Sequence, residues 1–395
     1  MRQITNFFSI RSENRLKIDL ILLGAGFILL MIGMVMVSSA SIAIADDQHG
    51  DPFFFLKKQF LAALIGCCAA FIGMVIPIRT WKNLSLPLLL LGITLLIIVF
   101  IPDIGRTVNG STRWISVAGI NFQVSEPARL CLLIYVAGYL VRRNRQLRES
   151  ISGFIPPIII LCITCGLLLF EPDYGASVVL LLSIMPMLFS AGARIRDFAI
   201  FVAISMIGMT VIAFLTPERI ERLYTFLEPW EYSQQGGFQL TQSLIAFGRG
   251  DWFGVGLGNG VQKLFYLPEV HTDFIFAVLV EELGLFGALV MILLFTILVV
   301  RIFQIALKAA RLERLFEAYL SIGIGSWLAI QTCINIGVNI GALPTKGLTL
   351  PLVSYGRSSL IITIIAIGMI LRISHEISGQ NLNQKRASLK KTEVS

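Results

Sequence analysis

Long apolar runs are the feature of this sequence that most constrains its fold. The stretch "LPLLLLGITLLIIVF" at 86–100 contains no charged residue, and comparable runs recur along the chain. Of the 395 residues, 56% are hydrophobic and only 14% are charged, whereas roughly a quarter are charged in a soluble domain. In lipid only helices and closed barrels satisfy every backbone hydrogen bond, and these runs have helical length. The sequence therefore predicts an all-α polytopic membrane protein.

Ten segments approach the ~20 apolar residues that a hydrocarbon layer of ~30 Å requires. The first is too long, and lacks the cleavage pattern, for a removable signal peptide. We expect one membrane domain over 18–375, with a cytoplasmic tail at 1–17 and a basic cytoplasmic tail at 376–395. The ten transmembrane helices are expected at 18–43, 60–78, 84–101, 124–141, 152–170, 174–192, 198–215, 276–300, 316–341 and 358–373.

Lysine and arginine predict how these helices are oriented. With both termini in the cytoplasm, the cytoplasmic segments hold 21 of the 32 basic residues, as the positive-inside rule requires. The net charge of +8 then indicates contact with membrane lipids, and no nucleic acid is expected as a partner. On this topology residues 216–272, between helices 7 and 8, form a large extracytoplasmic loop. Apolar residues at helical spacing in "FQLTQSLIAFG" indicate that this loop is structured.

Polar and charged residues whose burial in lipid would cost free energy gather on the same predicted outer side. The stretch "NGSTRWISVAGINFQVSEPARL" holds Arg113 and Trp114 in a loop, followed by Glu126 and Arg129 at i, i+3 spacing in the fourth span. An ion pair between Glu126 and Arg129 would offset part of the cost of placing each charge in lipid. Such a pair has two interpretations, a functional one and a role in holding helices together, and the pattern does not separate them.

Two further outer segments interrupt the apolar pattern. "LFEPDYGAS" places Glu171 and Asp173 in a tight turn, and "NIGALPTKGLTLPLVSYGRSSL" combines prolines and glycines with Lys346. Irregular backbone at membrane depth is tolerated only where it is buried in protein or lines a wet cavity. The sequence therefore predicts an outward-facing polar cavity beneath the long loop.

The acid-rich stretch "YLPEVHTDFIFAVLVEELG" at 266–284 leads into the eighth span. An acid between apolar walls tends to have a raised pKa, which suits a proton acceptor working near neutrality. Asp273 is the candidate for that role, although a helix N-cap is an alternative reading of the same residue. Glu281 and Glu282 could instead cap a helix or pair with arginines of neighbouring loops.

Several of these stretches closely resemble the signature segments of the SEDS family, which comprises FtsW, RodA and SpoVE. They are "LPEVHTDFIFAVLVEELGLFG", "LFEPDYGAS", "NGSTRWI", "FQVSEPARL" and "ALPTKGLTLPLVSYGRSSL", in the family's order over about 15–375. The form of "PTKGLTLP" and "GNGVQKLFYLPEVHTDF" is most like the FtsW branch. The chain departs from the family pattern at Arg357, Asp251 and Arg129.

The resemblance implies a peptidoglycan glycosyltransferase of cell division. It would polymerise lipid II into glycan strands at the septum, on the outer face of the bacterial cytoplasmic (inner) membrane, and would release undecaprenyl diphosphate with inversion. The implied partners are a class B penicillin-binding protein, the FtsI-type transpeptidase, and the regulators FtsQ, FtsL, FtsB and FtsN. The rival functions are a lipid II flippase, an elongation polymerase of the RodA type and a scaffold that recruits the transpeptidase.

The family's essential acid corresponds to Asp273, which we assign as the catalytic base. No metal-ligand spacing is present and no cofactor is required, although the acids and the substrate's diphosphate leave room for a divalent cation such as Mg²⁺ or Mn²⁺. The candidate substrate-binding residues are Arg113, Trp114, Glu126, Arg129, Gln239, Ser243, Lys263, His271, Thr272, Lys346 and Ser354.

Overall fold

The computed structural model describes residues 18–108, 111–117, 120–214, 217–234 and 236–392, and most of them are helical. The predicted N-terminal tail, 1–17, lies outside the described residues. The helices are α2 (Leu20–His49), α3 (Phe54–Val75), α4 (Ile78–Asn83), α5 (Ser85–Ile98), α6 (Ser125–Arg142), α7 (Asn144–Glu149), α8 (Ile151–Phe170), α9 (Tyr174–Ser190), α10 (Ile195–Phe214), α11 (Pro217–Leu227), α12 (Phe238–Gly250), η1 (Gln262–Tyr266), α13 (Ile275–Arg311), α14 (Leu315–Asn339) and α15 (Arg357–Thr392).

Each of the ten predicted segments lies on one of these helices. Among the described residues, seven helices are long and apolar enough to cross a membrane: α2, α3, α8, α10, α13, α14 and α15. α5 and α9 are apolar but shorter, and α6 carries three charged residues. The chain is therefore a multi-pass helical membrane protein, and the count of ten spans stays a prediction.

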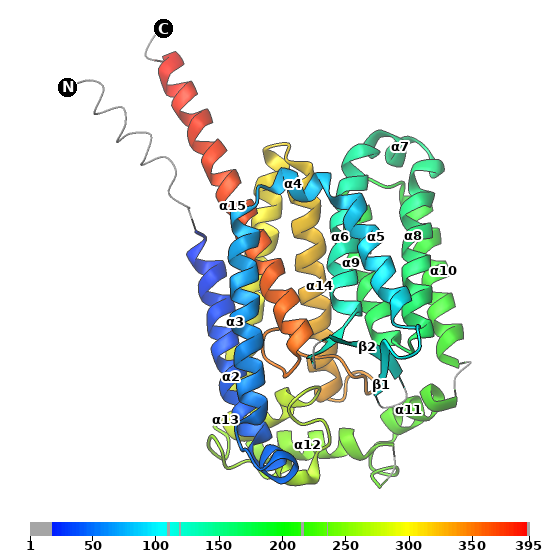
Figure 1. Ribbon diagram of the computed structural model, residues 1–395, viewed down its shortest axis with the longest axis vertical. Coiled ribbons are helices and arrows are strands. Elements are labelled where there is room, and N and C mark those ends of the chain that lie inside the picture. The colour runs from blue at the N-terminus through cyan, green and yellow to red at the C-terminus, as the bar shows by residue number, and fades with distance from the viewer. Residues whose placement is uncertain (1–17, 109–110, 118–119, 215–216, 235, 393–395) are drawn as a thin grey trace, which may run out of the picture.

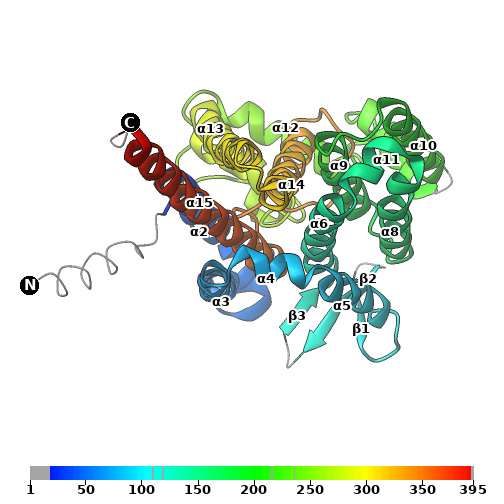
Figure 2. The same ribbon diagram turned by 90° about the horizontal axis from the view of Figure 1, so that it is seen from above.

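α14 lies at the centre of the bundle and contacts α6, α9 and α13. α2, α3 and α15 lie on one side of it, and α8 and α10 lie on the other (Figure 2). Side chains of α14 are mostly buried, including the polar residues Gln331, Asn335 and Asn339. Buried amides of this kind need hydrogen-bond partners. Their partners come from the segments around Asp273, as described below.

β1, β2, α11 and α12 gather at one end of the bundle, and α4, α7 and the far end of α15 lie at the other (Figure 1). Segments predicted to be outside therefore lie together, and so do those predicted to be inside. Within 216–272 the structure has α11, α12 and the short π-helix η1. The predicted structured segment is confirmed, and its side of the membrane stays a prediction.

Two regions differ from the sequence-based expectation. Residues 105–123, predicted as a loop, contain an antiparallel sheet of β1 (Gly105–Val108), β2 (Ser111–Val117) and β3 (Ile120–Gln123). Its short strands follow turn residues and lack the long runs that hydropathy detects. α15 continues to Thr392, so this helix is longer than the apolar span predicted at 358–373. The assignment of residues 376–395 as a cytoplasmic tail stays a prediction.

Candidate active site

Asp273 lies in the turn just before α13, and two asparagines of α14 hold its backbone. Asn335 Nδ2 donates to the Asp273 carbonyl oxygen at 2.9 Å, and Asn339 Nδ2 donates to the same oxygen at 3.0 Å. Asn339 Oδ1 also accepts from the Ala277 amide in the first turn of α13, at 3.0 Å. Ser243 of α12 donates to the Asn339 carbonyl oxygen at 2.7 Å. A buried polar network therefore fixes where Asp273 sits.

The side chain of Asp273 is half-buried, and among the described residues nothing donates a hydrogen bond to its carboxylate. The backbone of the loop 343–356 passes directly beside it, since a Cβ atom placed on Gly347 would lie 2.9 Å from Asp273 Oδ2. Burial and, to a smaller extent, the charge of Glu269 raise the pKa of Asp273 against the opposing charge of Arg113, and the net result is a pKa of about 7. The result is a carboxyl group that can exchange a proton near neutral pH.

His271 and Thr272 fasten the turn that carries Asp273. The His271 carbonyl oxygen accepts a hydrogen bond from the Tyr355 amide at 2.9 Å. The imidazole ring of His271 packs on the Phe55 ring, with 4.6 Å between the ring centroids. Burial lowers the pKa of His271, so its imidazole is neutral at pH 7. Thr272 Oγ1 donates to Glu269 Oε2 at 2.8 Å. His271 and Thr272 both directly precede Asp273 in the chain, and their predicted contacts with substrate stay predictions.

Arg113 of β2 reaches the turn between α8 and α9. Its guanidinium donates to the carbonyl oxygens of Glu171, at 3.2 Å, and Pro172, at 2.7 Å, and lies 3.8 Å from Asp173 Oδ1. Trp114 is the next residue of the same strand, so its side chain leaves the opposite face of the sheet. The structure therefore places Arg113 near Asp273 and directs Trp114 away from Arg113.

Glu171 is a residue of this site that our residue assignments omitted. Its side chain is fully buried, and both carboxylate oxygens lack a hydrogen-bond partner among the described residues. Burial and, to a smaller extent, the charge of Asp173 raise the pKa of Glu171 against the opposing charge of Arg113, and the net result is a pKa of about 8. The sequence feature that could have identified Glu171 is the pair of acids, Glu171 and Asp173, in "LFEPDYGAS". Asn335 and Asn339 were also missed, although polar residues within an apolar span are a recognised sign of function.

The predicted ion pair between Glu126 and Arg129 is present and fully buried, at 3.3 Å. Arg129 also donates to Gln331 Oε1 at 3.0 Å and stacks over Trp327 of α14. Gln331 in turn donates to the Thr349 carbonyl oxygen at 2.9 Å. The pair thus connects α6 to α14 and to the same loop that covers Asp273.

Lys263 lies in a different network, which anchors the long loop to α13. Its ammonium donates to Glu282 Oε1 at 2.7 Å and to the Ser39 hydroxyl at 3.0 Å. Glu281 accepts from the amides of Val261 and Gln262 and pairs with Arg249 at 3.1 Å. The expected pairing with an arginine is confirmed for Glu281, whereas Glu282 pairs with Lys263 instead of an arginine.

A break in α13 next to this network receives the loop. Gly284 has φ +70° and ψ −170°, and an added Cβ would lie 2.4 Å from the Gly254 amide nitrogen. Only glycine accepts both that φ and that contact. Leu285 and Phe286, whose amides are freed by the break, donate to the carbonyl oxygens of Asp251 and Trp252. The loop therefore continues the hydrogen bonding of the helix.

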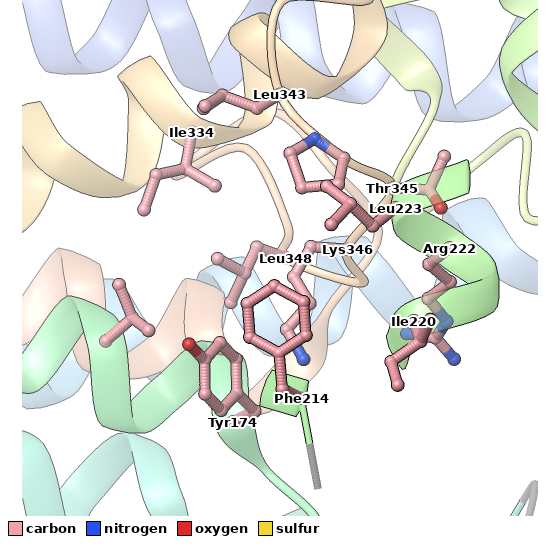
Figure 3. Close-up of a pocket in the computed structure, with 13 residues that line it drawn as sticks. Tyr174, Phe214, Ile220, Arg222, Leu223, Ile334, Leu343, Thr345, Lys346 and Leu348 are labelled. Carbon is pink, nitrogen blue, oxygen red and sulfur yellow. The ribbon is translucent and has the colours of Figure 1, made fainter. Parts of the chain in front are cut away.

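An apolar pocket of about 270 Å³ is lined by residues of α9, α10, α11 and α14 and of the loop 343–356 (Figure 3). Lys346 and Leu348, which flank Gly347, form part of its wall. Lys346 lies over the ring of Tyr174, 4.7 Å from its centroid. Arg222 of α11 is the second basic residue of the lining. The remaining lining residues are Gly175, Val178, Phe214, Ile220, Leu223, Ile334, Leu343, Pro344 and Thr345.

Ser354 and Gln239, the remaining residues predicted to bind substrate, make no hydrogen bond to Asp273 among the described residues. Ser354 accepts from the Leu350 amide at 2.8 Å and shapes the loop 343–356. Gln239 is half-buried on α12. No three histidine, cysteine or acidic side chains are grouped as a metal site within the described residues. These residues alone do not form a cage for a metal ion.

The family model of the FtsW/RodA/SpoVE cell cycle proteins matches residues 20–379. The chain belongs to this family. It is 48% identical to the probable peptidoglycan glycosyltransferase FtsW of Nitrosococcus halophilus, over 94% of this chain and 97% of that protein. It is also 48% identical to the protein of the same name from Legionella pneumophila, over 91% of this chain and 92% of that protein.

Solved structures of the family share this fold. A chain from a peptidoglycan synthase complex that coordinates polymerization and crosslinking has a TM-score of 0.74 and 27% identity, over 92% of this chain and 99% of that one. The rod shape determining protein RodA of Thermus thermophilus has a TM-score of 0.68 and 26% identity, over 91% and 98%.

Proposed function

We propose that this chain is a peptidoglycan glycosyltransferase of the FtsW branch, which polymerises lipid II at the division septum in the bacterial inner membrane. The branch is supported by relatives named FtsW at 48% identity over nearly the whole chain. The site observation that carries the proposal is the carboxylate of Asp273, which has no donor among the described residues and whose pKa is about 7.

In the proposed reaction, the 4-hydroxyl oxygen of the acceptor's terminal GlcNAc attacks C1 of the donor's MurNAc. The new C1–O bond forms as the bond from C1 to the diphosphate breaks, so the α-linked donor becomes a β-linked product. Asp273 takes the hydroxyl proton, and undecaprenyl diphosphate leaves with the bonding electron pair. One displacement with one base completes the transfer.

The leaving diphosphate requires positive charge close to Asp273. Lys346 precedes Gly347, on which an added Cβ would lie 2.9 Å from Asp273 Oδ2, and the charge of Arg113 acts on Asp273. Both cations could therefore stabilise the developing negative charge. The apolar pocket beside Lys346 suits the hydrocarbon of a lipid-linked substrate. A divalent cation held by the diphosphate stays an expectation.

A class B transpeptidase is the proposed partner. A family member from a complex that joins polymerization with crosslinking supports this pairing. The regulators FtsQ, FtsL, FtsB and FtsN stay expectations that rest on the resemblance. The flippase and elongation readings are not favoured, because the most similar relatives named here are called glycosyltransferases of the FtsW type.

The decisive experiment combines the purified chain, a class B transpeptidase and fluorescent lipid II in liposomes. Glycan strands are expected on gels, and lipid II placed only in the inner leaflet is expected to stay there. The control is the same mixture without the chain. If lipid II crosses the bilayer and no strand forms with any transpeptidase, the flippase reading is correct and the glycosyltransferase proposal is wrong.

The rate should depend on pH through Asp273. Only the deprotonated carboxylate accepts a proton, so activity is lost as pH falls through about 7 and levels off above it. The charge of Arg113 lowers the pKa of Asp273, so Arg113→Gln should shift the acidic limb of kcat/KM to higher pH. Arg106→Gln, on the neighbouring strand and exposed, is the control and should leave the limb in place. An unchanged limb in Arg113→Gln would contradict this assignment.

A further inference from the structure

A second pocket lies at the opposite end of α13 from Asp273, on the predicted cytoplasmic side. It has a volume of about 290 Å³, close to the lower end of the range of roughly 300–1,000 Å³ for small-ligand sites. The start of α2, the end of α13 and the middle of α15 enclose it. Its lining residues are Asp19, Arg301, Ile305, Lys308, Arg311, Leu312, Ser374, Ile377 and Ser378.

The charges lining this pocket do not cancel. Arg301 forms hydrogen bonds to both oxygens of Asp19 at 3.0 Å, and Ser374 Oγ donates to Asp19 Oδ2 at 3.3 Å. That acid is therefore fully engaged. Among the described residues the side chains of Lys308 and Arg311 have no hydrogen-bond or ion-pair partner. Two positive charges are left on the pocket wall.

The two cations and two hydroxyls come from different helices. Lys308 and Arg311 stand at i, i+3 on α13, one face of the helix, and Ser374 and Ser378 stand at i, i+4 on α15. Because the Ser374 hydroxyl already donates to Asp19, the donors left for a ligand are Lys308, Arg311 and the Ser378 hydroxyl. Two cations beside a hydroxyl are donors of the kind that a phosphate group requires. A neutral or cationic ligand would leave the two charges unpaired.

The surroundings of the pocket indicate where such a phosphate would come from. The apolar run of α13 ends at Val300, directly before Arg301, so the pocket lies level with the predicted inner headgroups. Leu20 is 77% exposed and Leu307 is 60% exposed, at the two helices that border it. Acyl chains could pack on these side chains while the headgroup enters the pocket.

We propose that this pocket binds an anionic phosphate group, supplied by the headgroup of an anionic phospholipid such as phosphatidylglycerol or by a free phosphate. The competing explanation is that Lys308 and Arg311, in the last turns of α13, only compensate the negative end of the helix dipole. That role would stabilise the helix equally in any lipid. A dependence on anionic lipid therefore separates the two explanations.

The test measures retention of phosphatidylglycerol by the purified full-length chain, using native mass spectrometry and the thermal unfolding midpoint. Lys308→Gln/Arg311→Gln should weaken phosphatidylglycerol binding about 30-fold, the combined effect of two basic residues at an anionic surface. Phosphatidylcholine is the lipid control. Arg79→Gln/Lys82→Gln removes two basic residues on the same predicted side but outside the pocket, and should bind as the unmodified chain does.

Each outcome decides the proposal. Loss of phosphatidylglycerol binding in the pocket variant alone supports the lipid source, and stabilisation by inorganic phosphate alone, lost in the same variant, supports a free phosphate. Equal loss in both double variants, or no loss in either, refutes the site. If the double variant fails to fold, Lys308→Gln alone should weaken binding about 5-fold, and unchanged binding would refute the site.

Discussion

Asp273→Asn is expected to lower lipid II polymerisation by about 10²–10⁴-fold, the range that positioned proton transfer contributes. The amide keeps the size of the carboxyl group but cannot accept the proton of the attacking hydroxyl. The Asn335 and Asn339 contacts go to the backbone oxygen of residue 273, so they survive the substitution. The fold should therefore be retained. The measurement is the initial rate of strand formation with the transpeptidase, beside the unfolding midpoint.

Asp251→Asn is the matched control for this variant. Asp251 lies at the end of α12, is exposed, and uses its backbone oxygen to accept from Leu285. Asparagine has the same shape as aspartate and leaves that backbone hydrogen bond in place, so the loop should keep its shape. Polymerisation is expected to be unchanged. An Asp273→Asn variant that folds and keeps more than about a tenth of the activity would show that another group takes the proton.

Lys263→Met is expected to destabilise the chain by about 3–5 kcal/mol, the usual cost of removing one partner from a buried ion pair. Glu282 is completely buried, and Lys263 is the cation that pairs with it at 2.7 Å. Methionine fills similar space but leaves the Glu282 carboxylate, among the residues that the structure describes, with only the Ser39 hydroxyl. The measurement is the free energy of unfolding in mixed micelles, from denaturant titration.

Lys57→Met gives the comparison for an exposed pair. Lys57 bonds to Asp51 at the same 2.7 Å, but its side chain is 69% exposed, so stability should barely change. The result also decides what Lys263 does. If Lys263→Met leaves stability unchanged and lowers only the affinity for lipid II, the residue binds substrate, as its sequence position suggested, and the structural role is wrong.

The sequence was sufficient for features that depend on local pattern. Continuous apolar runs identify a helix wherever it must face lipid, and each predicted segment lies on a helix of the structure. The spacing of Glu126 and Arg129 predicted an ion pair, since i, i+3 residues share a helix face. The small sheet at 105–123 was missed because its strands are short and carry no hydropathy signal.

Partners distant in the chain were decided by the tertiary structure alone. Lys263 and Arg113 looked alike as outer cations, yet Lys263 neutralises Glu282 and Arg113 reaches the turn at Glu171 beside the site. The role of Asn335 and Asn339 can be recognised only when α14 is placed against the turn before α13, where both amides donate to the Asp273 carbonyl oxygen. Similar residue types therefore received different roles from the packing of the helices around them.

By itself the sequence determined that the chain is a helical membrane protein, and the resemblance of its motifs selected Asp273. These conclusions follow from periodicity and from short contiguous segments, which do not depend on what lies across the bundle. The tertiary structure decided that Asp273 is held by two asparagines, faces Gly347 and has a pKa of about 7. Burial and the field of distant charges set that pKa, and both exist only after the helices have packed.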